Sequence, residues 1–325
     1  MNFELSDEQR AIAETARELL AARSSSADPW REMCDLGWPG IAVGESHGGQ
    51  GLGVLELAIL IQELGFACTP SPMLGTSLAA LAIEATADRT DAGHWLPGLV
   101  DGSRPGALAV ADRRDLVPDA ASDRLVVLAW GETGVGRVHA ADAIEDAEAI
   151  DPLRKHGLVA SSPGEGKALS GDLRPTLDRA AVVVSAELVG LCRRALDLTL
   201  THVKERRQFG VPVGSFQAVQ HAAAEMLRAT ESAEVLTYRA AWIADNEPAQ
   251  LPAAAGMAKG SASSAGLEVT AAAIQLHGGM GFTWEAPLHW LFKRAQVDAA
   301  YLGGSSFHQA RLARAVAAEI AAGRP

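Results

Sequence analysis

Two glycine-rich turns near the end of the chain, Gln275-Leu-His-Gly-Gly-Met-Gly-Phe282 and Tyr301-Leu-Gly-Gly-Ser305, interrupt Ala- and Leu-rich sequence. A glycine directly after a helix supports the left-handed exit of the chain, so the first turn predicts the end of a helix at about Leu276. No other histidine lies at metal-ligand spacing from His277, which we interpret as a packed side chain without a catalytic role. The two turns are therefore expected to join helices.

The sequence before these turns has the spacing of long packed helices. Apolar residues alternate at three and four positions from Leu188 to Leu198, and this pattern is sustained longer in the next segment. The members of that longer seam are Val219, Ala222, Met226, Ala229, Ala233, Leu236, Ala240 and Ile243. Further helices are predicted over 253–276 and 305–321, which gives a four-helix bundle.

The N-terminal part of the chain is also predicted to be helical. Ser6 and Gln9 form a capping-box pattern that starts a helix running to Ala22. Other helices are expected over 30–36, 54–65 and 74–87, and the first of these ends at Gly37-Trp-Pro39. Gly48-Gly-Gln-Gly-Leu-Gly53 is interpreted as a flexible turn, because a phosphate-binding loop would require a preceding strand.

The stretch from 106 to 171 has a different pattern. Short apolar runs at 107–110, 125–130 and 157–160 are separated by clusters of Gly, Pro, Asp and Ser, which is typical of strands and turns. The fold class is therefore mainly α with a small β region. We expect an N-terminal helical domain over 1–104, a β domain over 105–173 and a C-terminal helical bundle over 174–325.

Composition excludes several classes of function. The 325-residue chain carries a formal net charge of -12, which argues against nucleic-acid binding. Its first residues are acidic where a signal peptide is basic, and no uncharged apolar run approaches the ~18 residues of a membrane span. The cysteines, Cys34, Cys68 and Cys192, follow no metal-ligand spacing and are interpreted as buried thiols in a reducing compartment. We expect a cytoplasmic protein without metal, membrane or nucleic-acid partners.

The order of these motifs resembles the acyl-CoA dehydrogenase family. The resemblance rests on Leu5-Ser-Asp-Glu-Gln9, Leu36-Gly-Trp38, the Gly48–Gly53 turn, Glu63-Leu-Gly65 and the two C-terminal turns. It implies a helical N-terminal domain, a middle β domain and a four-helix bundle, with Trp95-Leu-Pro-Gly98 leading into the β domain. The β domain is shorter than in the family.

The resemblance also implies a flavin cofactor, FAD. Lys204-Glu-Arg-Arg-Gln-Phe-Gly210 and Val213-Gly-Ser-Phe-Gln217 are similar to the loop that contacts the FAD of a neighbouring subunit. In isolation, Arg206 could equally complement a helix C-terminus. The positions that the family assigns to the adenosine-diphosphate half of FAD are Arg206, Gln208, Phe209, Phe216, Gln217, Gln275, Gly278 and Gly279.

Two family features are missing from this chain. The position after Tyr301, where the family carries the glutamate that removes the substrate α-proton, is Leu302, and the alternative position in the bundle is Ala180. Asp178 and Glu187 are interpreted as solvated carboxylates on helix surfaces. The segments that hold the flavin ring in the family are absent, and Ala109-Val-Ala-Asp-Arg113 replaces the first of them.

A chain with this fold but without the base is similar to the short subunits of heteromeric acyl-CoA dehydrogenases in actinobacterial steroid side-chain degradation. This similarity implies a longer partner subunit that carries the base, a heterotetramer and an acyl-CoA substrate. Two alternatives stay open: a self-sufficient homo-oligomeric dehydrogenase with an unrecognised base, and a flavin-free structural protein of the same fold.

Overall fold

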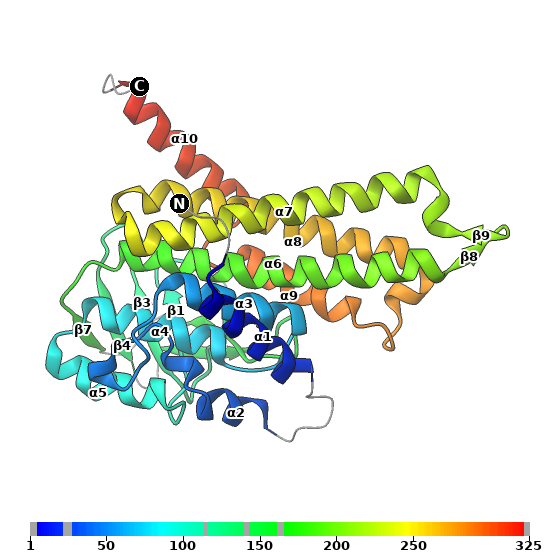
Figure 1. Ribbon diagram of the computed structural model, residues 1–325. Helices are drawn as coiled ribbons and strands as arrows, with labels where there is room; N and C mark the ends of the chain where they lie inside the picture. The colour runs from blue at the N-terminus through cyan, green and yellow to red at the C-terminus, as the bar shows by residue number, and fades with distance from the viewer. Residues whose placement is uncertain (1–4, 22–27, 114–115, 140–142, 161–165, 322–325) are drawn as a thin grey trace.

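A computed structural model describes residues 5–21, 28–113, 116–139, 143–160 and 166–321. Short N-terminal helices and a small β region lie along one side of a bundle of long helices (Figure 1). The N-terminal helices are α1 (Asp7–Ala21), α2 (Pro29–Asp35), α3 (Val54–Ala67), α4 (Met73–Thr86) and α5 (Arg89–Val100), with 3-10 turns at η2 (Trp38–Gly40) and η3 (Glu45–His47).

The capping box at the start of α1 is confirmed. The Ser6 backbone N–H donates to Gln9 Oε1 at 2.9 Å, and the Gln9 N–H donates to Ser6 Oγ at 3.2 Å. A helix start leaves four backbone N–H groups without partners inside the helix, and a capping box commonly provides partners for two of them. The helix is described to Ala21, and the expected last residue, Ala22, lies outside the described residues.

Helix α3 lies at the centre of the N-terminal part and crosses the first bundle helix, α6 (Arg174–Glu205), at close range. A Cβ added to Gly65 would lie 2.3 Å from the Glu187 carbonyl oxygen, and one added to Gly190 would lie 2.0 Å from the Gln62 carbonyl oxygen. Glycine at both positions lets the two backbones touch. This contact fixes the N-terminal helices against the bundle.

Helix α5 differs from the expectation for its segment. Trp95-Leu-Pro-Gly98 was expected as a connection into the β domain, yet it lies inside a helix that begins after the N-cap Asp88. The Asp88 Oδ1 accepts hydrogen bonds from the N–H groups of Thr90 and Asp91, both at 2.9 Å. Pro97 and Gly98 disfavour a helix locally, but packing of the buried Leu96 and Leu99 outweighs that preference.

The β region consists of two small sheets. The first has the order β1-β3-β4-β7 and the second has the order β2-β6-β5. Strand β1 runs parallel to β3, with Gly106 opposite Leu125, and the other pairs are antiparallel. The strands are β1 (Gly106–Val110), β2 (Val117–Pro118), β3 (Leu125–Ala129), β4 (Gly136–His139), β5 (Ile144–Ala147), β6 (His156–Val159) and β7 (Lys167–Leu169). The three apolar runs expected as strands correspond to β1, β3 and β6.

The bundle is formed by α6, α7 (Gln217–Asn246), α8 (Leu251–His277) and α9 (Leu288–Ala300), with η5 (Pro248–Gln250) between α7 and α8. The seam predicted for α7 is confirmed, because Met226, Ala233, Ala240 and Ile243 are buried and the other members are half-buried. Small side chains along the seam allow α7 to lie close to α6 and α8.

The structure corrects the prediction of which helix is the fourth in the bundle. Helix α10 (Ser305–Ala321) exists as predicted, but only its first turns pack on α8 and the rest projects from the body (Figure 1). Helix α9 completes the bundle and was not predicted. Its buried face carries Arg294 and Asp298 beside Leu291 and Ala295, so the apolar period that marks a helix in sequence is broken.

Within the described residues, no helix is long and apolar enough to cross a membrane, and no cluster of three or more His, Cys, Asp or Glu side chains is arranged to hold a metal ion. The three cysteines are free thiols. Cys192 is buried as expected, whereas Cys34 and Cys68 are partly exposed.

Candidate functional site

The loop between α6 and α7 forms a hairpin at one end of the bundle (Figure 1). Its strands are β8 (Arg207–Gln208) and β9 (Val211–Pro212), followed by η4 (Val213–Ser215). Arg206 ends α6, and its backbone N–H donates to the His202 carbonyl at 2.8 Å. Phe209 turns the hairpin at a left-handed φ of 52°, and its ring meets the Phe216 ring edge to face at 6.3 Å between centroids.

The glycine turn after α8 lies at the same end of the bundle. His277, at the end of α8, stacks on His202, at the end of α6, with 4.2 Å between ring centroids. Burial lowers the pKa of His202, and the neighbouring His277 and Arg206 lower it further, which favours the neutral imidazole. The stack therefore holds the hairpin residues and the turn η6 (Gly278–Phe282) side by side.

All eight residues predicted to contact FAD are exposed on this surface, which we call the bundle tip. Within the described residues, no acid is paired with the Arg206 side chain. A Cβ at Gly278 or Gly279 would meet nothing within 4 Å, so the backbone there is open to a ligand. A guanidinium suits a diphosphate, and open glycine backbone with nearby amides suits a nucleotide, so the chemistry fits the adenosine-diphosphate half of FAD.

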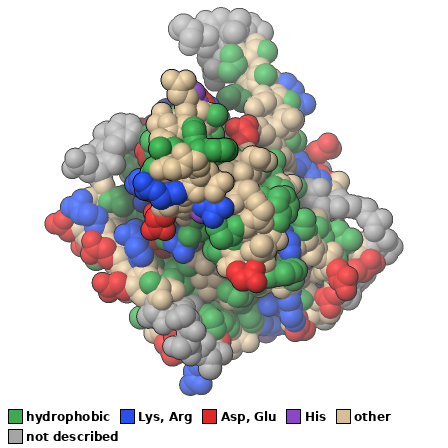
Figure 2. Space-filling model, turned by 90° about the vertical axis from the view of Figure 1, so that its right-hand side faces the viewer, with side chains coloured by type: hydrophobic (Ala, Val, Ile, Leu, Met, Phe, Trp, Pro, Cys, Tyr) green, Lys and Arg blue, Asp and Glu red, His purple; other side chains and the backbone are tan. Residues whose placement is uncertain are grey.

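Large apolar side chains surround these polar groups. Phe209 is 92% exposed, Phe282 80% and Trp284 73%. Figure 2 looks onto this end of the molecule and shows Lys and Arg side chains beside hydrophobic ones. Exposed aromatic groups of this size next to arginines are typical of protein interfaces, so the tip has the character of a surface that another protein covers.

Leu302 lies in the turn between α9 and α10, at a left-handed φ of 59°. The Tyr301 hydroxyl donates to the Leu108 carbonyl at 2.5 Å, which ties this turn to strand β1. The buried Lys259 donates from Nζ to three carbonyls around the turn, those of Asp298 (3.0 Å), Ala299 (3.1 Å) and Gly303 (3.2 Å). Burial lowers the pKa of Lys259 to about 7. The backbone of this turn is therefore held in place by several hydrogen bonds. The Leu302 side chain has no proton-accepting group.

The turn borders a cavity of about 570 Å³ between β1, the start of α6 and α10. Asp178 lines this cavity and was interpreted as a solvated carboxylate, which is wrong. Its side chain is buried, and both oxygens accept hydrogen bonds from Arg311, at 2.5 and 2.8 Å. Both oxygens of this carboxylate are therefore engaged by Arg311, and the alternative base position is filled by the buried Ala180.

The flavin-ring side of the family site does not fit this chain. Ala109, Val110 and Ala111 carry no hydroxyl group, and the following Asp112 and Arg113 place charged side chains at the cavity. The guanidinium of Arg113 lies 4.0 Å above the Phe307 ring. The residues present therefore suit the adenosine-diphosphate end of the cofactor at the bundle tip and not its ring beside Leu302.

Glu187 was interpreted as an exposed carboxylate, and this is also wrong. It is buried in an ion-pair cluster where the N-terminal helices, the β region and the bundle meet. The cluster consists of Asp119, Asp151, Arg154, Glu187, Arg294 and Asp298, and we call it the junction cluster. The partners are scattered along the chain, so no local spacing could have revealed it.

Arg154 and Arg294 organise the junction cluster. Arg154 pairs with Glu187, with Asp298 at 3.3 Å and with Asp119 at 3.9 Å. Arg294 pairs with Asp151 at 2.9 Å and donates to the Thr69 carbonyl at 3.0 Å. These contacts connect α6, α9, the loop before β6 and the turn after α3, so the cluster fixes how the three parts of the chain sit together.

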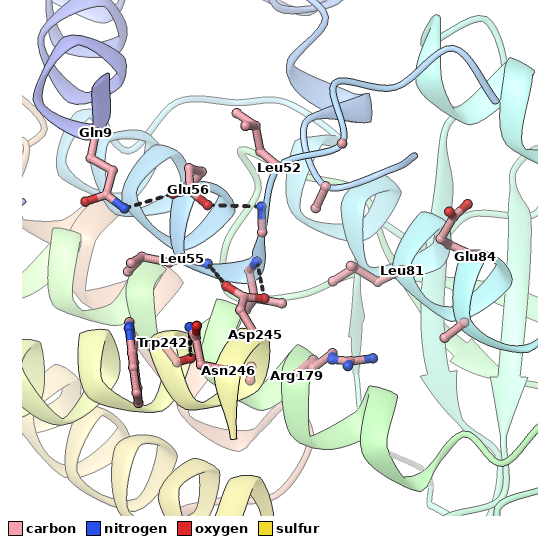
Figure 3. A pocket seen from close by; sticks show the side chains of 16 residues that line it. Gln9, Leu52, Leu55, Glu56, Leu81, Glu84, Arg179, Trp242, Asp245 and Asn246 are labelled. Carbon is pink, nitrogen blue, oxygen red and sulfur yellow. Dashed lines mark hydrogen bonds between the residues drawn. The ribbon is translucent and has the colours of Figure 1, made fainter. Parts of the chain in front are cut away.

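A second cavity, of about 600 Å³, lies where the Gly48–Gly53 loop meets α7 (Figure 3). Asp245 on α7 accepts hydrogen bonds from the N–H groups of Val54 and Leu55, at 2.9 and 3.1 Å, and so caps α3. A Cβ on Gly53 would lie 2.4 Å from Asp245 Oδ2, so glycine is required for this contact. The loop is thus held in place by specific contacts and does not have the open donors of a phosphate loop.

Comparison with protein families matches the chain to two descriptions: acyl-CoA dehydrogenase, N-terminal domain, over residues 6–103, and acyl-CoA dehydrogenase, C-terminal domain, over residues 173–317. Among characterised relatives, acyl-CoA dehydrogenase IpdE2 of Mycobacterium tuberculosis is 33% identical, covering 91% of this chain and 93% of the relative. IpdE2 of Mycolicibacterium smegmatis is 32% identical, covering 92% and 96%.

Solved structures share the architecture. A variant of the Tcur3481-Tcur3483 steroid ACAD superposes with a TM-score of 0.86 and 29% identity, covering 97% of this chain and 99% of the other. The ChsE4-ChsE5 complex of Mycobacterium tuberculosis gives a TM-score of 0.83 at 22% identity, with coverage of 98% and 99%. The second likeness concerns the fold alone.

Proposed function

Because this chain belongs to the acyl-CoA dehydrogenase family, whose members oxidise a CH–CH bond, we propose that it is one subunit of a heteromeric FAD-dependent acyl-CoA dehydrogenase. The observation that carries the proposal is the contrast between the two ends of the family site. The residues that the family assigns to adenosine-diphosphate contacts are exposed together at the bundle tip, whereas the base position holds Leu302 and the ring-binding segment is replaced.

In this proposal, the chain completes a cofactor site that its partner begins. Bound FAD would supply the acceptor for a hydride from the substrate β-carbon. Arg206 would pair with the diphosphate, Gln275 and Gln217 would offer amides, and Gly278 and Gly279 would admit the nucleotide to the backbone. Phe209 and Phe216 would shield the bound cofactor from water on the side that faces the partner subunit. The partner would supply the carboxylate that takes the α-proton.

The substrate proposed is an acyl-CoA with a bulky acyl group, including the CoA thioester of a steroid side chain. Support comes from the likeness to the Tcur3481-Tcur3483 steroid ACAD, which covers nearly all of both chains at 29% identity. The expected assembly is a heterotetramer with a longer dehydrogenase subunit. The exposed apolar side chains at the bundle tip support a protein partner there.

The proposal predicts that the purified chain alone binds little FAD and does not oxidise acyl-CoA. Coexpression with a longer dehydrogenase subunit that carries the family glutamate is expected to yield a yellow, active complex. The measurement is the flavin absorbance per chain together with turnover against an artificial electron acceptor. Stoichiometric flavin and turnover in the lone chain would instead establish a self-sufficient dehydrogenase, and a colourless complex would favour a structural protein.

A second prediction concerns the base position. Leu302→Glu in the lone chain is expected to give no dehydrogenase activity, because a base works only within hydrogen-bond reach of a substrate held against a flavin ring. Turnover is the readout, with Leu302→Gln as a control of similar size without the acid. Activity in the glutamate variant alone would contradict the prediction and show that the chain's own ring and substrate sites are intact.

A further inference from the structure

The cavity beside Leu302 has no role in the proposed function, although its lining residues suit a ligand. Val110, Leu177, Leu302 and Phe307 provide an apolar wall, and the cavity of about 570 Å³ is large enough for a medium-sized ligand. Since Leu302 has no titratable group and Ala109-Val-Ala-Asp-Arg113 replaces the segment that holds the flavin ring in the family, a molecule entering this cavity would be bound without being oxidised.

The polar side of the cavity carries an available cation. Arg113 rests on the face of Phe307, and no described acid forms an ion pair with it. Of the other lining arginines, Arg311 is held by Asp178 and Arg174 by Asp172 at 2.7 Å, whereas Arg314 is exposed to solvent and pairs with no described acid. A guanidinium that lies on an aromatic face still presents its edge N–H groups to a ligand.

Two helix starts add positive potential to the same place. Helix α6 begins at Arg174 and α10 begins at Ser305, and residues in or next to the first turn of each line the cavity. Neither helix has an acidic residue in its first turn. Asp172 accepts a hydrogen bond from the Arg174 N–H at 2.9 Å and so offsets part of the positive end of α6, whereas no described acid does this at the start of α10. The remaining lining acids, Asp112 and Glu132, are exposed to solvent.

A buried histidine, His308, also lines this cavity. It is 2% exposed, and its Nε2 contacts the Leu302 carbonyl at 3.2 Å, so Nε2 carries the proton. Burial, with a smaller effect of Lys259, lowers the pKa of His308 to about 4, and the ring is neutral at pH 7. Its Nδ1 has no hydrogen-bond partner within the described part of the chain. A buried acceptor of this kind is unfavourable unless a donor reaches it, and because an ionised carboxylate carries no hydrogen, a water and not the head group of an acid must supply it.

We propose that this cavity is a non-catalytic binding site for an apolar carboxylic acid, with the carboxylate on Arg113 and the apolar body against Leu177, Leu302 and Phe307. The site is independent of the proposed role in FAD binding, because it lies beside the Leu302 turn and away from the bundle tip. An anionic head group could also come from the phosphates of a CoA thioester, and the experiment separates these sources.

The test is isothermal titration calorimetry of the full chain with dodecanoate, dodecan-1-ol and dodecanoyl-CoA. Dodecanoate is expected to bind at one site per chain and more tightly than the alcohol. Arg113→Met should weaken dodecanoate binding about tenfold or more, as expected for loss of a charge-assisted hydrogen bond, without changing the affinity for the alcohol. Arg113→Lys should restore part of the affinity.

Arg104→Met is the matched control. Arg104 also lies over an aromatic ring, with its guanidinium 4.8 Å from the Trp95 centroid, but it is outside the cavity lining, so dodecanoate binding should not change. Circular dichroism verifies that each variant is folded. The proposal is overturned if wild type does not bind dodecanoate, if Arg113→Met binds it as wild type does, or if only dodecanoyl-CoA binds.

Discussion

Arg154→Met is expected to lower the free energy of unfolding by about 3 to 5 kcal/mol, because removing one partner of a buried ion pair leaves uncompensated charge in a low-dielectric interior. Arg154 is paired with three acids of the junction cluster, and its side chain is 3% exposed. Methionine keeps much of the volume but no charge. Urea unfolding followed by circular dichroism measures the change.

Lys155→Met is the control for this prediction. Lys155 is the next residue and forms an ion pair with Asp123 at 3.0 Å, but both side chains are more than half exposed. Solvent-exposed pairs typically contribute about 0 to 1 kcal/mol, so this variant should unfold near the wild-type urea concentration. If the two variants were equally destabilised, or if neither were, the junction cluster would not fix the parts of the chain together.

The protonation of the junction cluster gives this prediction a pH signature. Two arginines face four carboxyl groups, and burial raises the pKa of both Asp119 and Asp298, with Glu187 raising that of Asp298 further. The folded state therefore binds more protons than the unfolded chain above the ordinary aspartate pKa, and stability falls as the pH rises there. Asp298→Asn resembles the protonated acid, so it should unfold with a weaker dependence on pH than wild type above pH of about 4.

Arg206→Ala is expected to weaken FAD binding by the assembled complex about 10- to 100-fold, the typical effect of losing a charge-assisted hydrogen bond worth about 1.5 to 3 kcal/mol. Arg206 is exposed at the end of α6, and no described acid is paired with it. Its removal should leave the chain folded and associated. Titration of FAD into the apo-complex measures the loss, after size-exclusion chromatography has verified assembly.

Arg207→Ala is the matched control for Arg206. Arg207 has the same charge and is also exposed, but it lies in β8, outside the family's contact position. FAD affinity should be unchanged in this variant. If Arg206→Ala bound FAD as tightly as wild type, the bundle tip would be an interface without a cofactor contact, and the chain would be a structural companion of its partner.

Much of the fold follows from local sequence pattern. The seam through Met226, Ala233 and Ala240 predicts α7, because a helix that packs along one face must repeat its apolar residues at three and four positions. The alternation of apolar runs with turn residues predicts the main strands for a similar reason. The departure at the family's base position is also visible in the sequence, since Leu302 has no titratable group whatever its surroundings.

The candidate site was only partly accessible from sequence. The residue types at the bundle tip were identified from a resemblance, and the structure brings the two separate segments together through the stack of His202 on His277. Their contact with FAD stays a prediction. The cavity with Arg113 and His308 was not predicted, because its lining comes from four separate parts of the chain.

Sequence by itself determined which helices have an apolar face, where the main strands lie and that Leu302, which has no titratable group, occupies the family's base position. Tertiary structure alone decided where the charged residues are. Asp178 and Glu187 look like surface carboxylates on their own helix, yet Arg311 and Arg154, from distant segments, make their burial possible. Helix α9 was missed for the same reason, since Arg294 and Asp298 can face the core only when distant partners neutralise them. Burial of a charge depends on partners that local spacing does not contain.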